Sequence, residues 1–197
     1  MSRTVIGLVG GIASGKSMVA TLFAEERSAV HLDADSVARR VLDRPAIGEA
    51  VAREIPGAVG RDGKMDRQKL AREVFSNPQA LAALEEITHP PIRRAMERAI
   101  RKARAPYVLV DAALLQETGA DELCDVVLYV ACPARTRRAR SRRHRGWSEE
   151  EHRAREARQW SCRRKRAAAD LVIDNFSDEA RTRRGVRRVL GRLERRG

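Results

Sequence analysis

A glycine-rich phosphate-binding motif stands directly between a strand pattern and a helix pattern near the start of the sequence. Residues 10–17, Gly-Gly-Ile-Ala-Ser-Gly-Lys-Ser, fit the pattern GxxxxGK followed by Ser or Thr in full. The apolar run 4–9 before the motif predicts a buried strand, and the apolar spacing within 17–26 predicts a helix. A second strand pattern follows at 29–32. This order of strand, turn, helix and strand opens a parallel α/β sheet.

Three further strand patterns lie in the second half of the chain and divide it into modules. Apolar runs at 107–111, 125–130 and 171–175 predict the remaining strands. The roughly 70 residues between the second and third strands exceed an ordinary βα connection and carry helical patterns, so they predict an inserted helical module. The stretch 134–166 predicts a second helical excursion between strands. We therefore expect an α/β fold with a parallel sheet flanked by helices.

The positive charge of the chain is concentrated in two stretches. The 197 residues include 40 Lys and Arg against 27 Asp and Glu, a formal charge of +13. Residues 134–166 carry a surplus of +10 and residues 181–196 a surplus of +7, which leaves the rest at −4. Guanidinium groups form paired hydrogen bonds with phosphate oxygens, so nucleic acid and nucleotides are both candidate partners of these stretches. The alternative is that the arginines form a solvent-exposed helix face with no partner. Aromatic residues for stacking on single strands are scarce there, with only Trp147 and Trp160.

Composition excludes several other classes of protein. A hydrophobic share of 43% with 34% charged residues is globular rather than disordered. Three widely spaced cysteines without a CxxC pair, Cys124, Cys132 and Cys162, favour neither a zinc ribbon nor a disulfide framework and suit a reducing compartment. The sequence has no signal-peptide pattern and no apolar stretch of about 18 residues. We expect a cytoplasmic protein with no membrane partner.

The motif at 10–17 predicts how a triphosphate is bound. Glycines let successive backbone N–H groups turn toward phosphate oxygens at a helix N-terminus. Lys16 should reach the outer phosphates and the Ser17 hydroxyl should ligate Mg²⁺. A glycine-rich turn that binds nothing is the alternative. The motif alone allows a kinase, an ATPase or a GTPase, but the sequence lacks NKxD, and Ala112 and Ala113 rather than a DxxG element follow the strand at 107–111.

Three carboxylates follow predicted strands at the edge where parallel sheets bind ligands. If the chain is still extended at Asp33 and Asp35, both side chains face the same way, and one could accept a hydroxyl proton while the other orients Mg²⁺. Either could instead cap the helix that the pattern starts near Ser36. Asp111 has the position of a carboxylate near Mg²⁺, or of an ordinary strand-end turn residue. An arginine-bearing flap at 134–166 could supply positive charge and exclude water during phosphoryl transfer.

Further motifs along the chain match one family. Residues 6–17 resemble the N-terminal segment of that family, and residues 33–39 resemble its DADxxAR element. Its DGxLDR turn is similar to residues 62–67, its LExIxHPxIR signature to 84–93 and its ADxVIDN element to 169–175. The last two elements discriminate it from other small phosphate-loop kinases. The chain resembles the bacterial dephospho-coenzyme A kinases over nearly its whole length.

This resemblance implies a three-part kinase. The nucleotide-binding core would comprise residues 1–35, 105–133 and 167–197. A helical domain at 36–104 would hold dephospho-coenzyme A, and an arginine-rich lid would span 134–166. ATP would phosphorylate the ribose 3′-hydroxyl of dephospho-coenzyme A in the last step of coenzyme A biosynthesis, with ADP as the other product. Another small-molecule kinase, such as a nucleoside or nucleotide kinase, and a nucleic-acid-binding module remain alternatives, and the sequence gives no oligomeric state.

The same resemblance implies roles for individual residues. Asp35 would be the general base, with Lys16 and the lid residue Arg140 as the other catalytic residues. Ser17 and Asp111 would hold Mg²⁺. ATP would contact Gly11, Ala13, Ser14, Gly15, Lys16, Ser17, Met18 and Asn175, the last near the adenine. The acceptor would contact Asp33, Arg39, His89, Arg93, Leu114 and Glu117.

Several positions depart from the family pattern. Ala13 replaces a glycine in the loop, which is acceptable only if its φ is negative. Met18 replaces a threonine and Ala113 a proline. In the lid, Glu156 takes an apolar position and His144 falls where an arginine is usual. None of these departures removes Lys16, Ser17, Asp33 or Asp35.

Overall fold

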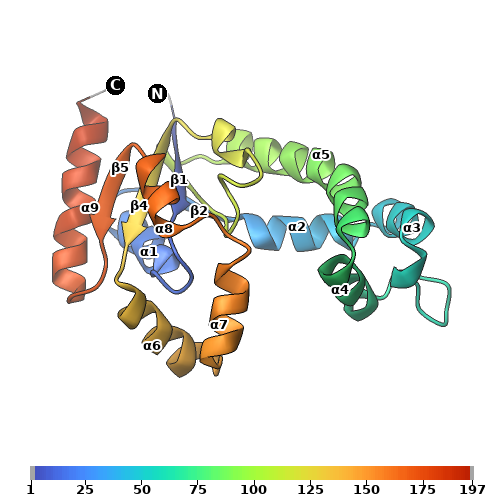
Figure 1. The fold of residues 1–197 in the computed structure, drawn as a ribbon. Coiled ribbons are helices and arrows are strands. Elements are labelled where there is room, and N and C mark those ends of the chain that lie inside the picture. The colour runs from blue at the N-terminus through green and yellow to red at the C-terminus, as the bar shows by residue number, and fades with distance from the viewer. Residues whose placement is uncertain (1–2, 196–197) are drawn as a thin grey trace. The chain divides into compact units, whose positions relative to one another are not determined.

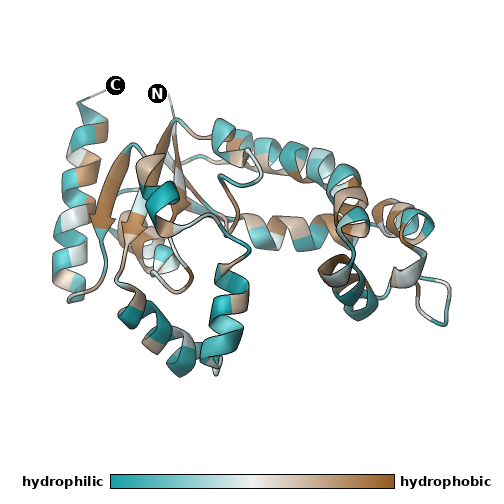
Figure 2. Cartoon of the chain, in the orientation of Figure 1, coloured by the Kyte–Doolittle hydropathy of each residue, from teal (hydrophilic) through white to brown (hydrophobic). Residues whose placement is uncertain are grey.

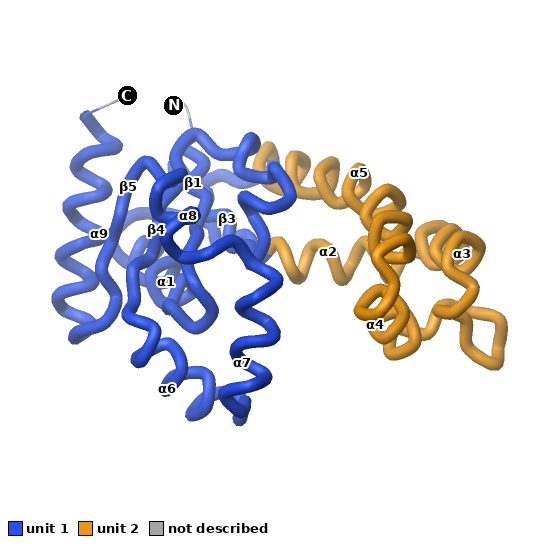
Figure 3. Tube along the Cα trace, in the orientation of Figure 1, with its two compact units in different colours: residues 1–33, 102–197 blue, residues 34–101 orange. Residues whose placement is uncertain are grey.

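The computed structural model describes residues 3–195 and divides the chain into two compact units (Figures 1 and 3). Residues 1–33 and 102–197 form one unit, called here the sheet unit, and residues 34–101 form the other, called the helical unit. Within the described residues, no helix is both long enough and apolar enough to cross a membrane. The functional division into core, acceptor domain and lid stays a prediction.

The sheet unit is built on five parallel strands in the order β2-β3-β1-β4-β5 (Figure 1). The strands are β1 (Thr4–Val9), β2 (Ala29–Asp33), β3 (Tyr107–Asp111), β4 (Val126–Ala131) and β5 (Leu171–Asp174). Each lies within one residue of the predicted run, so the expected α/β fold is confirmed. The register pairs Asp33 with Asp111, and this places the carboxyl ends of β2 and β3 at one edge of the sheet.

Helices α1 (Lys16–Glu26) and α9 (Glu179–Glu194) bury their apolar faces in one core with the strands. The spacing of the buried side chains of α9 is that of an amphipathic helix. Arg183 and Arg187 of α9 pair with Glu26 of α1 at 3.2 and 2.7 Å. The basic C-terminal stretch is therefore a packed helix whose polar side is partly neutralised by α1.

The segment between β3 and β4, which includes the short helix η2 (Ala120–Leu123), packs closely on β1. A Cβ on Gly7 would lie 2.6 Å from Leu115 Cδ2, so any larger residue there would require the Leu115 side chain to shift. Leu115 is fully buried. This contact fixes the segment that follows Asp111 onto the sheet.

The basic stretch 134–166 folds as three helices within the sheet unit, α6 (Ala134–Arg145), α7 (Glu149–Glu156) and α8 (Cys162–Ala167). Gly146 ends α6 with φ 66°, and Ser148 begins α7 with a capping box to Glu151. Figure 2 shows α6 and α7 as predominantly hydrophilic against the apolar strands. Their packing therefore depends on polar contacts.

The helical unit contains α2 (Ala34–Leu42), α3 (Pro45–Glu54), η1 (Pro56–Ala58), α4 (Arg67–Ser76) and α5 (Pro78–Lys102). Its own apolar cluster includes Val51, Ile55 and Leu70. Asp66 caps α4 by accepting hydrogen bonds from two backbone N–H groups. This separate core explains why the insertion is a compact unit.

Candidate active site

The phosphate-binding loop joins β1 to α1 and needs left-handed backbone at two positions. Gly15 has φ 89°, and a Cβ there would lie 2.0 Å from Asn175 Nδ2. Ala13 has φ 59°, which contradicts the expectation that an alanine at this place has a negative φ. The loop keeps the backbone shape that glycine favours, and the alanine is strained by it. The side chain of Ser14 is buried, and its Oγ has no hydrogen-bond partner within residues 3–195.

Side chains from distant parts of the sheet unit hold the loop from outside. Asn175 donates through Nδ2 to the carbonyl of Ser14 at 2.8 Å. Thr182 Oγ1 in turn donates to the side-chain amide oxygen of Asn175 at 3.2 Å. Arg140 Nη1 donates to the same Ser14 carbonyl at 3.2 Å. Asn175 and Arg140 thus orient the loop backbone. Met18, predicted as a nucleotide contact, packs against the core.

Three predicted residues come together at the start of α1. Ser17 Oγ donates to Asp111 Oδ2 at 3.1 Å, and Lys16 Nζ lies 3.6 Å from Asp111 Oδ1. His31 Nε2 lies 3.5 Å from Asp111 Oδ2. Burial alone would raise the pKa of the Asp111 carboxyl, but His31, Lys16 and Ser17 together outweigh it and lower that pKa. The hydrogen bond to Asp111 raises the pKa of His31 against its partial burial, and the charges of Asp111 and Asp33 add to this.

The donor set at this place fits Mg²⁺. Ser17 and Asp111 offer a hydroxyl and a carboxylate oxygen close together, next to a loop suited to phosphates. Mg²⁺ commonly takes one or two protein oxygens and fills its other positions with substrate phosphates and water. In the part of the chain that the structure describes, no group of three or more His, Cys, Asp or Glu side chains could hold a metal ion. The ion would thus depend on the nucleotide for its remaining ligands.

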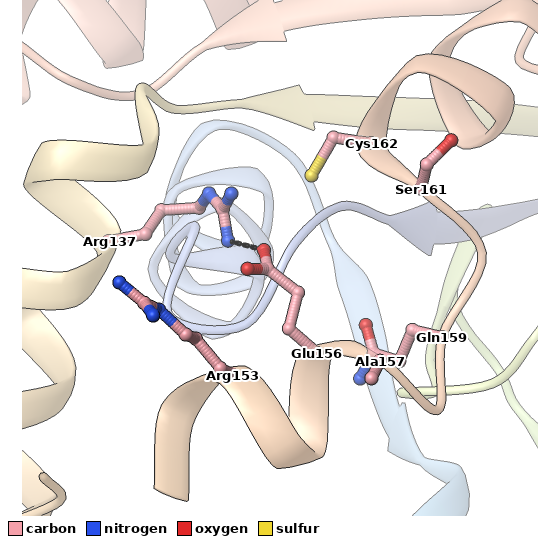
Figure 4. Close-up of a pocket in the computed structure, with 7 residues that line it drawn as sticks. All are labelled: Arg137, Arg153, Glu156, Ala157, Gln159, Ser161 and Cys162. Carbon is pink, nitrogen blue, oxygen red and sulfur yellow. Dashed lines mark hydrogen bonds and ion pairs between the residues drawn. The ribbon is translucent and has the colours of Figure 1, made fainter. Parts of the chain in front are cut away.

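A pocket next to the loop is lined by residues of α7, α8 and the connection between them, with Arg137 of α6 opposite (Figure 4). Its lining residues are Arg137, Arg153, Glu156, Ala157, Gln159, Ser161 and Cys162. The predicted lid arginine, Arg140, contacts the loop. Another arginine of the same stretch, Arg155 of α7, stacks on the ring of Trp147, 4.2 Å from its centroid.

The predicted base and several predicted acceptor contacts belong to the helical unit. Asp33 ends β2, whereas Asp35 lies in the first turn of α2. The two carboxylates are therefore not on one extended segment. The expectation that both side chains face the same way because of strand alternation is wrong. His89 and Arg93 lie exposed on α5, and Arg39 lies exposed on α2.

Comparison with known proteins identifies the family. The sequence model described as dephospho-CoA kinase matches residues 4–180. A Corynebacterium diphtheriae protein named dephospho-CoA kinase is 43% identical over 199 residues, covering 97% of this chain and 94% of the relative. The chain belongs to the dephospho-CoA kinase family. This family catalyses the final step of coenzyme A biosynthesis, so the chain is a kinase with ATP as co-substrate.

Solved structures share the fold of this chain, and one of them is a dephospho-CoA kinase. A Thermus thermophilus protein matches with a TM-score of 0.87 at 36% identity, covering 98% of this chain and 99% of the other. The dephospho-CoA kinase from Campylobacter jejuni matches with a TM-score of 0.68 at 25% identity, covering 97% of each chain. Shikimate kinase from Bacteroides thetaiotaomicron shares the fold at 14% identity, with a TM-score of 0.53 over 97% of this chain and 98% of the other.

Three residues that the sequence analysis did not predict make contacts at or near the candidate site of this dephospho-CoA kinase family member. Besides His31, these are Arg137 and Lys165, which are both buried. Lys165 Nζ lies 3.0 Å from Glu117 Oε1, and the same oxygen accepts a hydrogen bond from the Trp160 N–H at 2.7 Å. Glu117, predicted to contact the acceptor, thus anchors α8.

Sequence signals for these three residues were weak. Lys165 is one of only five lysines in an arginine-rich chain, a bias that could have marked it. His31 precedes Asp33 by two residues on one strand, so the alternation of side chains places both on one face. Arg137 had no signal, because it is one of thirteen arginines in its stretch. Leu114, the other predicted acceptor contact after β3, is exposed.

Proposed function

We propose that the chain transfers the γ-phosphoryl group of ATP to the ribose 3′-hydroxyl of dephospho-coenzyme A, with Lys16, Asp35 and Arg140 as its catalytic residues. The observation that carries this proposal is the cluster of Lys16, Ser17 and Asp111 at the loop of a dephospho-CoA kinase family member. Such a loop places a cation and oxygen ligands at the terminal phosphates of a nucleotide.

The chemistry needs a proton acceptor and compensation of negative charge. Asp35 would accept the proton of the attacking 3′-hydroxyl as that oxygen bonds to the γ-phosphorus and the bond to the β-phosphate oxygen breaks. Lys16 would bind the outer phosphate oxygens, and Arg140 would stabilise their charge from the lid side. Bound Mg²⁺, held by Ser17 and Asp111, would offset phosphate charge.

The acceptor would be held by residues of the helical unit and of the segment after β3. Arg39, His89 and Arg93 carry cationic or hydrogen-bonding groups suited to the phosphates of dephospho-coenzyme A. These three side chains are exposed, which favours contact with a ligand. Asp33 and Leu114 complete the proposed acceptor contacts.

The decisive experiment detects the product directly. Purified protein is incubated with ATP, Mg²⁺ and dephospho-coenzyme A, and mass spectrometry identifies coenzyme A and ADP, with 3′-nucleotidase treatment locating the new phosphate. A panel of nucleosides, nucleotides and shikimate tests other acceptors. ATP consumption without a 3′-phosphorylated product, or faster turnover of another acceptor, would exclude the proposed reaction.

Substitutions test the assigned roles. We expect Asp35→Asn to lower kcat by about 10²- to 10⁴-fold with ATP binding retained, because general base catalysis contributes on that order. Lys16→Ala should reduce both ATP binding and kcat. Glu49→Gln, an exposed carboxylate on α3, is the matched control in the helical unit. Near-normal turnover in Asp35→Asn would refute its role as the base.

The cellular setting proposed for this reaction is the cytoplasm, with small molecules as partners. The three cysteines are free thiols, as a reducing compartment would leave them. Measuring coenzyme A synthesis in fractionated cells that express the chain checks this location. Activity that sediments with membranes would contradict it.

A further inference from the structure

An ion pair between a buried arginine and a partly exposed glutamate lies directly beside the phosphate-binding loop. The Arg137 side chain is 6% exposed, and its Nη1 donates to Glu156 Oε1 at 2.5 Å. The same Nη1 donates to the carbonyl of Ile12 in the loop at 3.5 Å, and Nε donates to the carbonyl of Cys132 at 3.2 Å. A Cβ on Gly11 would lie 2.6 Å from Nη1. One guanidinium therefore joins α6, α7 and the loop backbone, as Figure 4 shows for its pair with Glu156.

We propose that Glu156 is a positioning residue that sets the nucleotide affinity of the loop. Its carboxylate holds the Arg137 guanidinium against the loop and cancels the positive charge that the phosphates of the nucleotide would otherwise meet. The inference rests on the proposed function only in taking ATP as the ligand of the loop. Neither residue needs to touch the nucleotide, because the field of a buried charge acts over several ångströms.

The charges around the loop favour this role for Glu156. Lys16, Arg137 and Arg140 bring three cations to the loop, and Asp111 lies 3.6 Å from Lys16. Burial opposes the charge on Arg137, but the hydrogen bond and charge of Glu156, together with Cys162 and Tyr129, outweigh it and raise the pKa of the guanidinium. Arg137 therefore stays ionised, and a neutral residue at 156 would leave a full positive charge at the loop.

The second oxygen of Glu156 faces another ionisable group, which fixes the conditions of a test. His152 Nε2 lies 3.8 Å from Glu156 Oε2, and its Nδ1 lies 2.9 Å from Ser141 Oγ. Burial lowers the pKa of His152, so at about pH 8 the imidazole is neutral. At this pH a substitution at 156 changes the charge of the carboxylate alone.

The test compares two variants that should shift nucleotide affinity in opposite directions. Glu156→Gln keeps an oxygen that accepts the Arg137 hydrogen bond but removes the negative charge, and Arg137→Gln removes the positive charge. Affinity for a non-hydrolysable ATP analogue is measured by titration calorimetry at pH 8, in low and high salt and without an acceptor. We expect Glu156→Gln to lower Kd by about threefold or more in low salt and Arg137→Gln to raise it by a similar factor. Both shifts should shrink as salt screens the field.

A matched control separates the local effect from a change of net charge. Glu150 lies exposed on the same helix as Glu156, and no ion pair of Glu150 occurs within residues 3–195, so Glu150→Gln changes the charge equally. Its Kd should stay at the wild-type value. An unchanged or higher Kd in Glu156→Gln, or an equal decrease in Glu150→Gln, would overturn the inference.

Misfolding cannot imitate the expected result, because tighter binding in Glu156→Gln requires a folded loop. The Kd of Arg137→Gln is interpreted only if the circular dichroism spectrum of that variant matches the wild-type spectrum. If Arg137→Gln misfolds, the Kd of Glu156→Gln alone decides the question. Failure of the proposed function gives a different outcome, namely that the wild-type protein binds no ATP analogue. Wild-type binding without the opposite shifts would contradict only the role of Glu156.

Discussion

At the level of single residues, the loop contains one strained position. Ala13 adopts φ 59°, a conformation that costs an L-residue with a Cβ about 1–2 kcal/mol. Ala13→Gly would remove that strain. The greater conformational freedom of glycine in the unfolded chain would reduce the resulting gain in stability by about 0.4–1 kcal/mol. We expect a net gain of about 0.5–1 kcal/mol in the free energy of unfolding, measured by urea titration. Equal or lower stability in Ala13→Gly would show that the alanine is not strained in solution.

His152 predicts a pH dependence of stability. Burial lowers its pKa below the usual value, so the unfolded chain binds this proton more readily than the folded chain. Its contribution to stability is therefore present above about pH 6.5 and is lost as the pH falls through the lowered folded pKa. Glu156 and Glu149 oppose the shift, whereas Arg137 and Arg138 reinforce it.

The matching experiment measures Tm in steps from pH 8 to pH 5.5. The wild-type Tm should fall more over this range than that of His152→Gln, in which the glutamine side chain does not titrate. His144→Gln, an exposed histidine on α6, should follow the wild type. Parallel curves for wild type and His152→Gln would show that His152 titrates normally.

At the level of elements, α8 is held on the sheet unit by one buried lysine. Lys165 donates to the carbonyl of Ala113 and to Gln159 Oε1, and it pairs with Glu117. Lys165→Met would leave the Glu117 carboxylate buried without its cation, which costs about 3–5 kcal/mol when such a pair is broken.

A double-mutant cycle measures this coupling. We expect the variant with both Lys165→Met and Glu117→Leu to be more stable than Lys165→Met alone, because neither charge then remains buried. Urea unfolding gives the four free energies, and Arg163→Met on the exposed side of α8 is the control. Additive losses in the double variant would mean that the two side chains do not interact.

Local patterns predicted the elements better than the contacts between them. The three central strands, β3, β1 and β4, lie where continuous apolar runs occur, because burial on both faces of a parallel sheet leaves a strong local signal. The edge strands β2 and β5 are shorter patterns with exposed residues, and they too lie within one residue of their predicted runs. The helix pattern was expected to begin near Ser36, whereas α2 begins at Ala34, directly after β2. Asp35 was therefore expected either on an extended segment or as a cap of that helix, and it lies instead in the first turn of α2.

The site was predictable where a motif encodes it and not where tertiary contacts build it. Lys16 and Ser17 follow from the loop motif, and Asp111 follows from its place at the end of a strand. Arg137 contacts the loop only because α6 packs beside it, and no local sequence pattern encodes that packing. The contact between Lys165 and Glu117 likewise joins segments separated by β4, α6 and α7.

At the level of the whole molecule, the charge of +13 is less available than the composition suggests. Arg183 and Arg187 pair with Glu26, Arg137 pairs with Glu156, and Arg153 pairs with Glu149. The exposed pairs add little stability, but each lowers the local positive field. These ion pairs thus lower the positive field of the basic stretches below the value that the composition alone suggests.

This charge arrangement predicts that a nucleotide and a nucleic acid act differently on the protein. Binding of ATP to the folded loop, as proposed above, should raise Tm with ATP concentration, since a ligand of the folded state stabilises it by mass action. Duplex DNA binds through counterion release, so its affinity falls steeply with salt. At about 0.15 M salt we expect ATP with Mg²⁺ to raise Tm by several degrees and DNA at equal phosphate concentration to leave it unchanged. Lys16→Ala removes the loop cation and should abolish the ATP effect. A DNA-induced rise in Tm that survives this salt concentration would instead favour the nucleic-acid module, because only a dedicated binding surface keeps affinity once the counterion contribution is reduced.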